Sequence, residues 1–261
     1  MTRALNGFNR IAWAYDSLNS LVFGQSIRNA QKVFLNCIPP GGELLVLGGG
    51  SGWILDEVFR INPHCKICFI DASSAMIRMA ERKVPASLLA RVEFIHGTTS
   101  DIPKRTFDAI ISNFFLDLFP AKTLESELER IHRALRRDGF WLISDFNNHG
   151  KWWQRLLLKV MYLFFNVTTG IEATELPPWE QKLDELGMEK KQARMFFGSF
   201  IKSILYRKLL DSEWVLSDLL DEIRFLLHQL NDLAKIIDLL SGQFKLPVAL
   251  AGLVGKLSDL L

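Results

Sequence analysis

Residues 44–53 read LLVLGGGSGW, an apolar run that leads directly into a glycine-rich loop. A short apolar run bounded by glycine predicts a buried strand, here residues 43–48. Glycine after a strand lets the backbone approach a ligand with no Cβ atoms in between. Since ligands of open parallel sheets bind beyond the carboxyl ends of the strands, we expect this loop to contact a ligand.

The spacing of the glycines narrows the class of ligand. A dinucleotide-binding loop requires G-x-G-x-x-G. Counted from Gly48 the last position is Trp53, and counted from Gly50 it is Leu55. The pattern that remains is G-x-G-x-G at positions 48, 50 and 52. This spacing disfavours a nicotinamide-dependent oxidoreductase, which we keep as an alternative.

Apolar runs and helical patterns alternate along the chain after this loop. Further strands are expected at 66–71, 91–97, 107–114 and 140–146, and helices at 52–62, 73–83 and 124–137. This alternation predicts right-handed βαβ units and a parallel sheet covered on both faces. Two last strands, 189–197 and 199–208, are joined by a turn so tight that they must form an antiparallel hairpin. The predicted fold is therefore α/β: a Rossmann-like, doubly wound sheet of seven strands with an antiparallel end.

Helical segments flank this sheet in the sequence. Helices are expected at 8–22 and 25–37 before it, and at 150–166 and 178–187 ahead of the hairpin. From residue 209 the apolar residues recur at i, i+3, i+4 and i+7, which is typical of an amphipathic helix. We therefore predict a domain of residues 1–208, in which residues 1–40 are N-terminal helices, and a helical extension at 209–261.

Composition excludes several classes of function. The 261 residues carry a formal net charge of +2 without a basic tract, which argues against a nucleic-acid partner. The apolar start of a signal peptide and an uncharged run of spanning length are both missing, so we expect a cytoplasmic protein. Cys65 and Cys68 form a C-x-x-C on a strand, which favours buried thiols over a redox or zinc site. No metal is expected.

Several stretches in order resemble the class I S-adenosylmethionine-dependent methyltransferases. They are VLGGGSGW (46–53), FIDASSAMIRMAERK (69–83), FDAIISNFFLDLFP (107–120), LRRDGFWLISDF (135–146) and the closing hairpin. The opening FNRIAWAYDSLNSLVFG (8–24) resembles the quinone-biosynthesis and small-molecule branch. The resemblance covers roughly residues 8–207 and implies S-adenosylmethionine as cofactor. Residues implied to bind it are Gly48, Gly49, Gly50, Gly52, Asp71, Ala72, Met76, Thr98, Asn113, Phe114 and Tyr15.

Asp71 ends the second predicted strand, where a carboxylate can accept hydrogen bonds from ribose hydroxyls. The alternative is that Asp71 caps the next helix, a role for which Ser73 competes. Two positions depart from the family pattern: Val46 stands where many members have an acidic residue, and Thr98 where many have aspartate. These departures leave open a non-catalytic relative that binds partners through its helical extension.

Methyl transfer from a sulfonium is an in-line displacement, which depends on alignment more than on acid or base catalysis. A proton acceptor is needed only when the acceptor atom carries a proton at working pH. The catalytic candidates lie near the strand ends: Asp117, Asp145 and His149. For Asp145, capping of the following helix is an equal alternative.

The stretch 152–167, within a helical cover at 147–188, combines two tryptophans, a tyrosine and two phenylalanines. The family resemblance implies that this cover lies over the acceptor, so we predict an apolar roof and a small, hydrophobic or lipid-like acceptor. Ordinary core packing is the alternative. This segment could contact a membrane surface, but we do not expect it to span a membrane. The extension at 209–261 is predicted to serve a homodimer or another helix-mediated partner.

Overall fold

The computed structural model describes residues 22–148, 150–169, 173 and 175–209. The chain divides into two compact units, Met1–Leu209 and Leu210–Leu261. The helix expected at 8–22, the candidates Tyr15 and His149, and the extension beyond Leu209 lie outside the described residues. These four expectations stay predictions.

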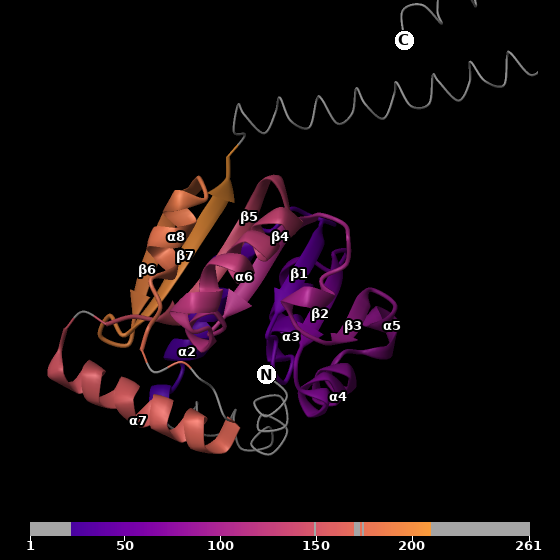
Figure 1. Ribbon diagram of the computed structural model, residues 1–261. Coiled ribbons are helices and arrows are strands. Elements are labelled where there is room, and N and C mark those ends of the chain that lie inside the picture. The colour runs from indigo at the N-terminus through magenta and orange to yellow at the C-terminus, as the bar shows by residue number, and fades with distance from the viewer. Residues whose placement is uncertain (1–21, 149, 170–172, 174, 210–261) are drawn as a thin grey trace, which may run out of the picture. The chain divides into compact units, whose positions relative to one another are not determined.

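The first unit is built on a seven-stranded sheet in the order β3-β2-β1-β4-β5-β7-β6 (Figure 1). Its five parallel strands are β1 (Glu43–Leu47), β2 (Lys66–Asp71), β3 (Val92–His96), β4 (Phe107–Asn113) and β5 (Leu135–Phe146). The strands β6 (Met188–Phe196) and β7 (Ile201–Lys208) form the antiparallel hairpin, with β7 paired to β5. The predicted fold is confirmed, and the chain order reverses between β1 and β4, which places the glycine loop at a topological switch point.

Seven described helices accompany the sheet, together with three short 3-10 segments. The helices are α2 (Ser26–Lys32), α3 (Trp53–Ile61), α4 (Ser74–Lys83), α5 (Ala86–Leu89), α6 (Ala121–Ala134), α7 (Trp152–Thr169) and α8 (Trp179–Glu185). The 3-10 segments are η1 (Leu35–Cys37), η2 (Thr99–Asp101) and η3 (Leu116–Leu118).

The helix expected at 124–137 ends earlier than predicted, at Ala134, and the next three residues already belong to β5. Leu135 is fully buried and pairs with Phe107 of β4, so its burial favours the sheet over another helical turn. Asp138 follows with φ +59°, in the left-handed region, where the register between β4 and β5 shifts. The prediction was wrong here because charged residues at helical spacing continue into the first residues of a strand.

Alternating residues of the strands bury both faces of the sheet, as parallel sheets require. Leu44 and Val46 pack with residues of α3 and α4, whereas Leu45 and Leu47 pack with residues of α6 and α8. The two cysteines of the C-x-x-C are divided in the same way, because Cys65 belongs to the first cluster and Cys68 to the second. All three cysteines are free thiols, so the prediction of buried thiols at these two positions is confirmed.

A third apolar cluster lies under α7, where β5 ends. Figure 1 shows α7 at this end of the sheet. It joins Phe146, the last residue of β5, to Phe23 and Phe200 and to the inner side of α7 through Leu158 and Trp153. The aromatic rings are closely packed: the centroids of Phe23 and Phe146 are 5.6 Å apart, and those of Phe146 and Phe200 are 5.3 Å apart. This cluster holds α7 over the edge of the sheet at which the parallel strands end.

Candidate functional site

The glycine loop after β1 has three glycines in the left-handed region, Gly48, Gly50 and Gly52, with φ of 60°, 59° and 80°. At Gly48 a Cβ atom would lie 2.6 Å from the ring of Phe115, and at Gly52 it would lie 2.5 Å from Cβ of Ala80. At Gly50 it would meet nothing within 4 Å. Packing inside the protein therefore requires glycine at two of these positions, and Gly50 alone of the three faces open space.

Asp71 lies at the carboxyl end of β2 and connects that end to the glycine loop. Its Oδ2 accepts a 2.9 Å hydrogen bond from the amide of Gly50, and its Oδ1 accepts a 2.8 Å bond from the amide of Ser73. Burial raises the pKa of this carboxyl, and the two backbone donors act in the opposite direction. The cap of α4 is Ser73, whose hydroxyl accepts a bond from the amide of Met76 at 3.2 Å. The capping role therefore belongs to Ser73, and Asp71 faces the loop.

The turn after β3 carries a carboxylate that the sequence reasoning missed. The amide of Thr98 donates a 2.8 Å hydrogen bond to Asp101, and the Thr98 hydroxyl lies 3.3 Å from the same oxygen and accepts from the amide of Ser100. The two residues form a capping box at η2. The spacing Thr-x-x-Asp was the available signal. An exposed carboxylate thus lies beside Thr98, where the family pattern has one at Thr98 itself.

The exit of β4 is strained. Phe114 has φ +51°, which a bulky side chain seldom adopts, and its amide donates a 2.7 Å hydrogen bond to the carbonyl of Ser144 in β5. Its ring lies 4.8 Å from that of Phe146, in contact with the aromatic cluster under α7. The next residue, Phe115, fills the space beside Gly48. Backbone strain of this kind gathers at functional sites, because the surrounding structure must hold it in place.

Two carboxyl groups are buried next to each other at the ends of β4 and β5. Asp145 has no exposed surface, and Asp117, in η3, is 6% exposed. The amide of Asp117 donates a 3.2 Å hydrogen bond to Asp145, whose other oxygen accepts from the amide of Phe146 at 2.8 Å. Burial raises the pKa of Asp117 to about 7, and burial together with the charge of Asp117 raises the pKa of Asp145 well above its usual range. The pair therefore retains a proton near neutral pH.

Tyr162, on α7, is the third polar group at this end of the sheet. Its hydroxyl is buried, and so is Oδ1 of Asp117; neither atom has a hydrogen-bond partner within the part of the chain that the structure describes. Burial raises the pKa of the Tyr162 phenol, and the negative charges of Asp117 and Asp145 raise it further. Buried polar atoms without partners are uncommon, so each requires an explanation.

The structure thus brings the predicted site residues together in two groups. The cofactor candidates Gly50, Asp71 and Met76 are linked through hydrogen bonds around Ser73, and Ala72 lies beside them with its carbonyl 3.1 Å from His96 Nε2. Gly49 contributes close packing, because a Cβ atom there would lie 2.1 Å from the Phe69 ring. Asn113, half-buried, ends β4 beside Ser144 and precedes the strained Phe114. Asp117 and Asp145 form the second group.

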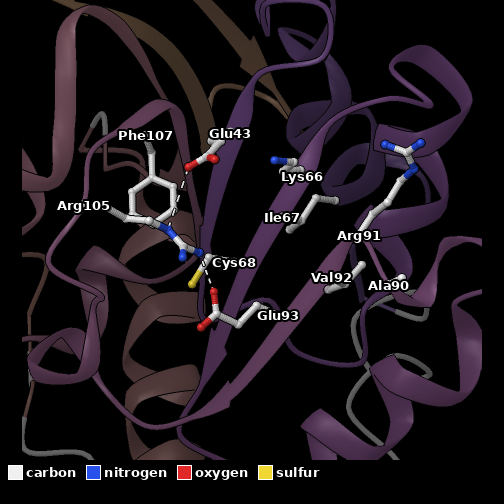
Figure 2. A pocket seen from close by; sticks show the side chains of 10 residues that line it. All are labelled: Glu43, Lys66, Ile67, Cys68, Ala90, Arg91, Val92, Glu93, Arg105 and Phe107. Atoms are coloured by element: carbon white, nitrogen blue, oxygen red, sulfur yellow. Dashed lines mark hydrogen bonds and ion pairs between the residues drawn. The ribbon is translucent and has the colours of Figure 1, made fainter.

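A cavity of about 280 Å³ lies at the opposite edge of the sheet (Figure 2). Its wall includes Glu43, Lys66, Val92 and Phe107, which are the first residues of their strands, so it faces away from the glycine loop. Arg105 in this cavity is paired with Glu93 and lies 3.8 Å from Glu43 (Figure 2). The carboxylates of the wall thus both face Arg105, and we assign the cavity no function. No metal-binding group of side chains occurs within the described residues.

The glycine loop at the switch point, the aspartate that ends β2 and the antiparallel closing hairpin together form the layout of the class I, S-adenosylmethionine-dependent methyltransferases that the sequence resembles. Residues 44–139 match the family described as a methyltransferase domain. The match begins in β1 and ends after Asp138, so it includes the glycine loop, Asp71 and Asp117. This stretch of the chain is therefore similar to that family.

Curated relatives and solved structures show likenesses of the same kind. Demethylmenaquinone methyltransferase of Thermotoga maritima is 31% identical over 146 residues, which are 54% of this chain and 61% of that protein. Malonyl-[acyl-carrier protein] O-methyltransferase of Priestia megaterium is 27% identical over 142 residues, 54% of this chain and 50% of that protein. The crystal structure of Burkholderia thailandensis 1,6-didemethyltoxoflavin-N1-methyltransferase, with bound 1,6-didemethyltoxoflavin and S-adenosylhomocysteine, superposes with a TM-score of 0.57 at 16% identity, covering 79% of this chain and 88% of that one. The chain spans 50–61% of the length of these two curated relatives, and the structural likeness concerns the fold.

Proposed function

We propose that this protein transfers a methyl group from S-adenosylmethionine to a small, apolar acceptor at the carboxyl end of the sheet. The observation that carries the proposal is the contact between Gly50 and Asp71. This contact turns the carboxylate of Asp71 toward Gly50, which is the one glycine among Gly48, Gly50 and Gly52 that faces open space. A carboxylate has about four acceptor positions, so two remain after the bonds from Gly50 and Ser73.

The residues present fit S-adenosylmethionine. Asp71 would accept hydrogen bonds from the ribose hydroxyls, and the backbone around Gly48 and Gly50 would contact the cofactor closely. Asp101, with Thr98, supplies a carboxylate at the turn after β3, where we place the adenine amino group. When bound, the cofactor supplies an electrophilic methyl group on a cationic sulfur. The chain's own task is to align the acceptor with that methyl group and to exclude water.

The acceptor side is formed by the aromatic cluster under α7. Phe114, which is half-buried, adjoins the buried rings of Phe146 and Phe200 there, and this apolar setting suits a hydrophobic or lipid-like acceptor. The partnerless oxygens of Asp117 and Tyr162 supply the polar groups, so the acceptor should carry a hydroxyl or similar donor. Asp117 would accept its proton, since burial raises the pKa of Asp117 to about 7. Asp145 would act as a positioning residue, through its bond to the Asp117 amide. His149 stays a further candidate, as does Tyr15 for closing the pocket.

The alternatives have less support. Val46 is buried in the apolar cluster between the sheet and the helices α3 and α4, so its side chain faces the core and a carboxylate there would be costly. The missing acidic residue at this position therefore gives no reason to expect a non-catalytic protein. The third glycine of a dinucleotide-binding loop is replaced by Trp53, which disfavours a nicotinamide cofactor.

Calorimetry with S-adenosylmethionine and S-adenosylhomocysteine tests the first half of the proposal. We expect binding by the wild type and by Gly150→Ala, a matched variant whose glycine also has a left-handed φ, of 79°, and open surroundings. Gly50→Ala should bind at least about tenfold more weakly, because its Cβ atom would enter the ligand's space. Absence of binding at millimolar cofactor, or binding of NADH instead, would overturn the proposal.

Transfer of a labelled methyl group to a panel of acceptors tests the second half. The panel should pair apolar molecules that carry a hydroxyl with the same molecules lacking it, and with polar molecules of similar size. We expect turnover only with the hydroxylated apolar members. Tight cofactor binding together with no transfer to any member would support the non-catalytic alternative.

A further inference from the structure

The outer side of α7 is apolar and exposed. Its stripe consists of Trp152, Leu156, Val160, Leu163 and Val167, at intervals of three and four residues, which places them on one face of the helix. Trp152 is 72% exposed, Leu163 66% and Val167 76%. Exposed large apolar residues are normal when scattered, but a continuous row of them marks an interaction surface.

The charges of α7 are of one sign. Residues 151–169 include Lys151, Arg155 and Lys159 and no acidic residue. Arg155 and Lys159 are exposed and, among the described residues, make no ion pair, whereas the ammonium of Lys151 donates to the carbonyl of Gly198 at 3.2 Å. On a helix at 3.6 residues per turn, positions 155 and 159 flank the apolar stripe on one side. The face is therefore an apolar band with a cationic border.

We propose that this face of α7 docks on an anionic lipid bilayer, with the helix lying in the plane of the membrane surface. An interfacial helix buries its apolar side at the boundary of headgroups and acyl chains and keeps its cations at the level of the phosphates. Tryptophan at the helix start, Trp152, is a residue type enriched at that level. Within the described segments, no helix is both long and apolar enough to cross the bilayer. Charge complementarity selects an anionic surface over a neutral one.

The opposite side of the same helix carries Leu158 and Tyr162, which pack in the apolar cluster of the candidate acceptor site. A bilayer docked on α7 would therefore lie one helix diameter, about 10 Å, from that site. Resting on the proposed function, this placement narrows the acceptor class to apolar molecules dissolved in the membrane. The docking itself does not depend on that function, because it is measured without turnover.

Sedimentation of the full-length protein with vesicles tests the proposal. Vesicles rich in phosphatidylglycerol should retain the protein, those of pure phosphatidylcholine should retain little, and high salt should release much of the bound fraction. Arg155→Glu/Lys159→Glu should weaken retention by at least about thirtyfold, since each cation near an anionic surface contributes about 1 kcal/mol, or about fivefold. Leu156→Glu/Leu163→Glu should abolish retention, because it places charge within the apolar stripe.

Matched controls separate this face from general charge and hydrophobicity. Arg82→Glu/Lys104→Glu makes the same charge change at two exposed positions elsewhere, and Leu89→Glu changes an exposed leucine of α5, far from α7 (Figure 1). Both control variants should leave retention unchanged. Calorimetry with S-adenosylmethionine should give wild-type affinity for every variant, so a loss of retention cannot be attributed to unfolding or to a failure of the proposed function.

Three results would overturn the docking. Equal retention by both kinds of vesicle would exclude charge recognition. Retention that survives Leu156→Glu/Leu163→Glu would assign membrane binding to another segment, such as residues 210–261. A change of oligomeric state in that variant, measured by analytical ultracentrifugation without vesicles, would identify the face as a contact between two copies of the chain.

Discussion

The amide of Gly50 and the carboxylate of Asp71 are joined by a 2.9 Å hydrogen bond that links the glycine loop after β1 to the end of β2. Asp71 ends β2, and Gly50 lies in the loop after the adjacent parallel strand β1, at the switch point of the sheet. Because the second oxygen of Asp71 accepts from Ser73, the carboxylate is held in a fixed orientation before any ligand binds. Such preorganisation lowers the entropy cost of binding.

Replacement of Asp71 should therefore affect stability and cofactor affinity together. In Asp71→Ala the amides of Gly50 and Ser73 lose their acceptor, which costs about 1–3 kcal/mol for each buried donor. Affinity for S-adenosylmethionine should fall at least about a hundredfold, as expected for the loss of two hydrogen bonds to a charged group. Urea unfolding and calorimetry measure the two effects.

Ser73→Ala is the matched control for Asp71→Ala. It removes the cap of α4, which contributes about 1 kcal/mol, but leaves the carboxylate in place. Wild-type cofactor affinity is expected in this control. Unchanged affinity in Asp71→Ala would show that Asp71 only holds the loop.

Replacements in the glycine loop can distinguish the glycines needed for packing from the one that faces the ligand. Gly52→Ala should destabilise by about 2–5 kcal/mol, because its Cβ atom would lie 2.5 Å from Ala80 in addition to the left-handed φ. Gly50→Ala and Gly150→Ala should each cost only about 1–2 kcal/mol, since nothing lies within 4 Å of either added atom. Thermal or urea unfolding ranks the three. A cost for Gly50→Ala equal to that of Gly52→Ala would contradict the open surroundings of Gly50.

The sequence predicted the elements of the sheet well, because strand periodicity and the tight hairpin turn are local signals. General rules of topology limit the possible strand orders, and the observed order β3-β2-β1-β4-β5-β7-β6 comes from the structure. The end of α6 was predicted wrongly, since Leu135 is fixed by pairing with Phe107 across the sheet, which no local pattern contains. Propensity is overridden by such tertiary contacts.

The site was predictable only in part, for a similar reason. Asp71 and the glycine spacing are readable in the sequence, but the reason for each glycine is not: Gly48, Gly49 and Gly52 adjoin Phe115, Phe69 and Ala80, which are distant in the chain. Likewise Asp117 and Asp145 are 28 residues apart and become neighbours only through the pairing of β4 and β5. Their burial, and so their shared proton, depends on packing that a single sequence does not contain.

The cysteines give a prediction that is independent of function. Burial raises the pKa of Cys65 to about 11 and that of Cys68 to about 12, so both thiols should be unreactive at neutral pH. Cys37 is partly exposed, and burial raises its pKa less. A thiol reagent should modify one residue in the folded protein and all three after unfolding. Cys37→Ser should remove the fast reaction, whereas rapid loss of Cys65 and Cys68 together would contradict their burial on opposite faces.

The buried pair Asp117 and Asp145 should make stability depend on pH. Both pKa values are raised above the unfolded value of about 3.9, so the folded state binds protons more tightly than the unfolded state. The contribution to stability is full below about pH 4 and is lost as pH rises through about 7 for Asp117. Asp117→Asn removes one of the two acids, and the side-chain amide of the new asparagine can donate a hydrogen bond to Asp145. The variant should be more stable than the wild type at about pH 8, and that advantage should vanish toward about pH 4.

Urea unfolding across this pH range measures the effect on stability, and methyl transfer measures the effect on catalysis. If Asp117 accepts the acceptor's proton, the wild-type rate should rise with pH through about 7, and Asp117→Asn should lose at least about a hundredfold in rate. Its affinity for S-adenosylmethionine should not change, because Asp117 lies on the acceptor side. The control is Asp138→Asn, at an exposed position with a left-handed backbone that asparagine also tolerates. It should change neither the pH dependence of stability nor that of the methyl-transfer rate. A wild-type pH profile retained in Asp117→Asn would assign the proton transfer to another group, with His149 the next candidate.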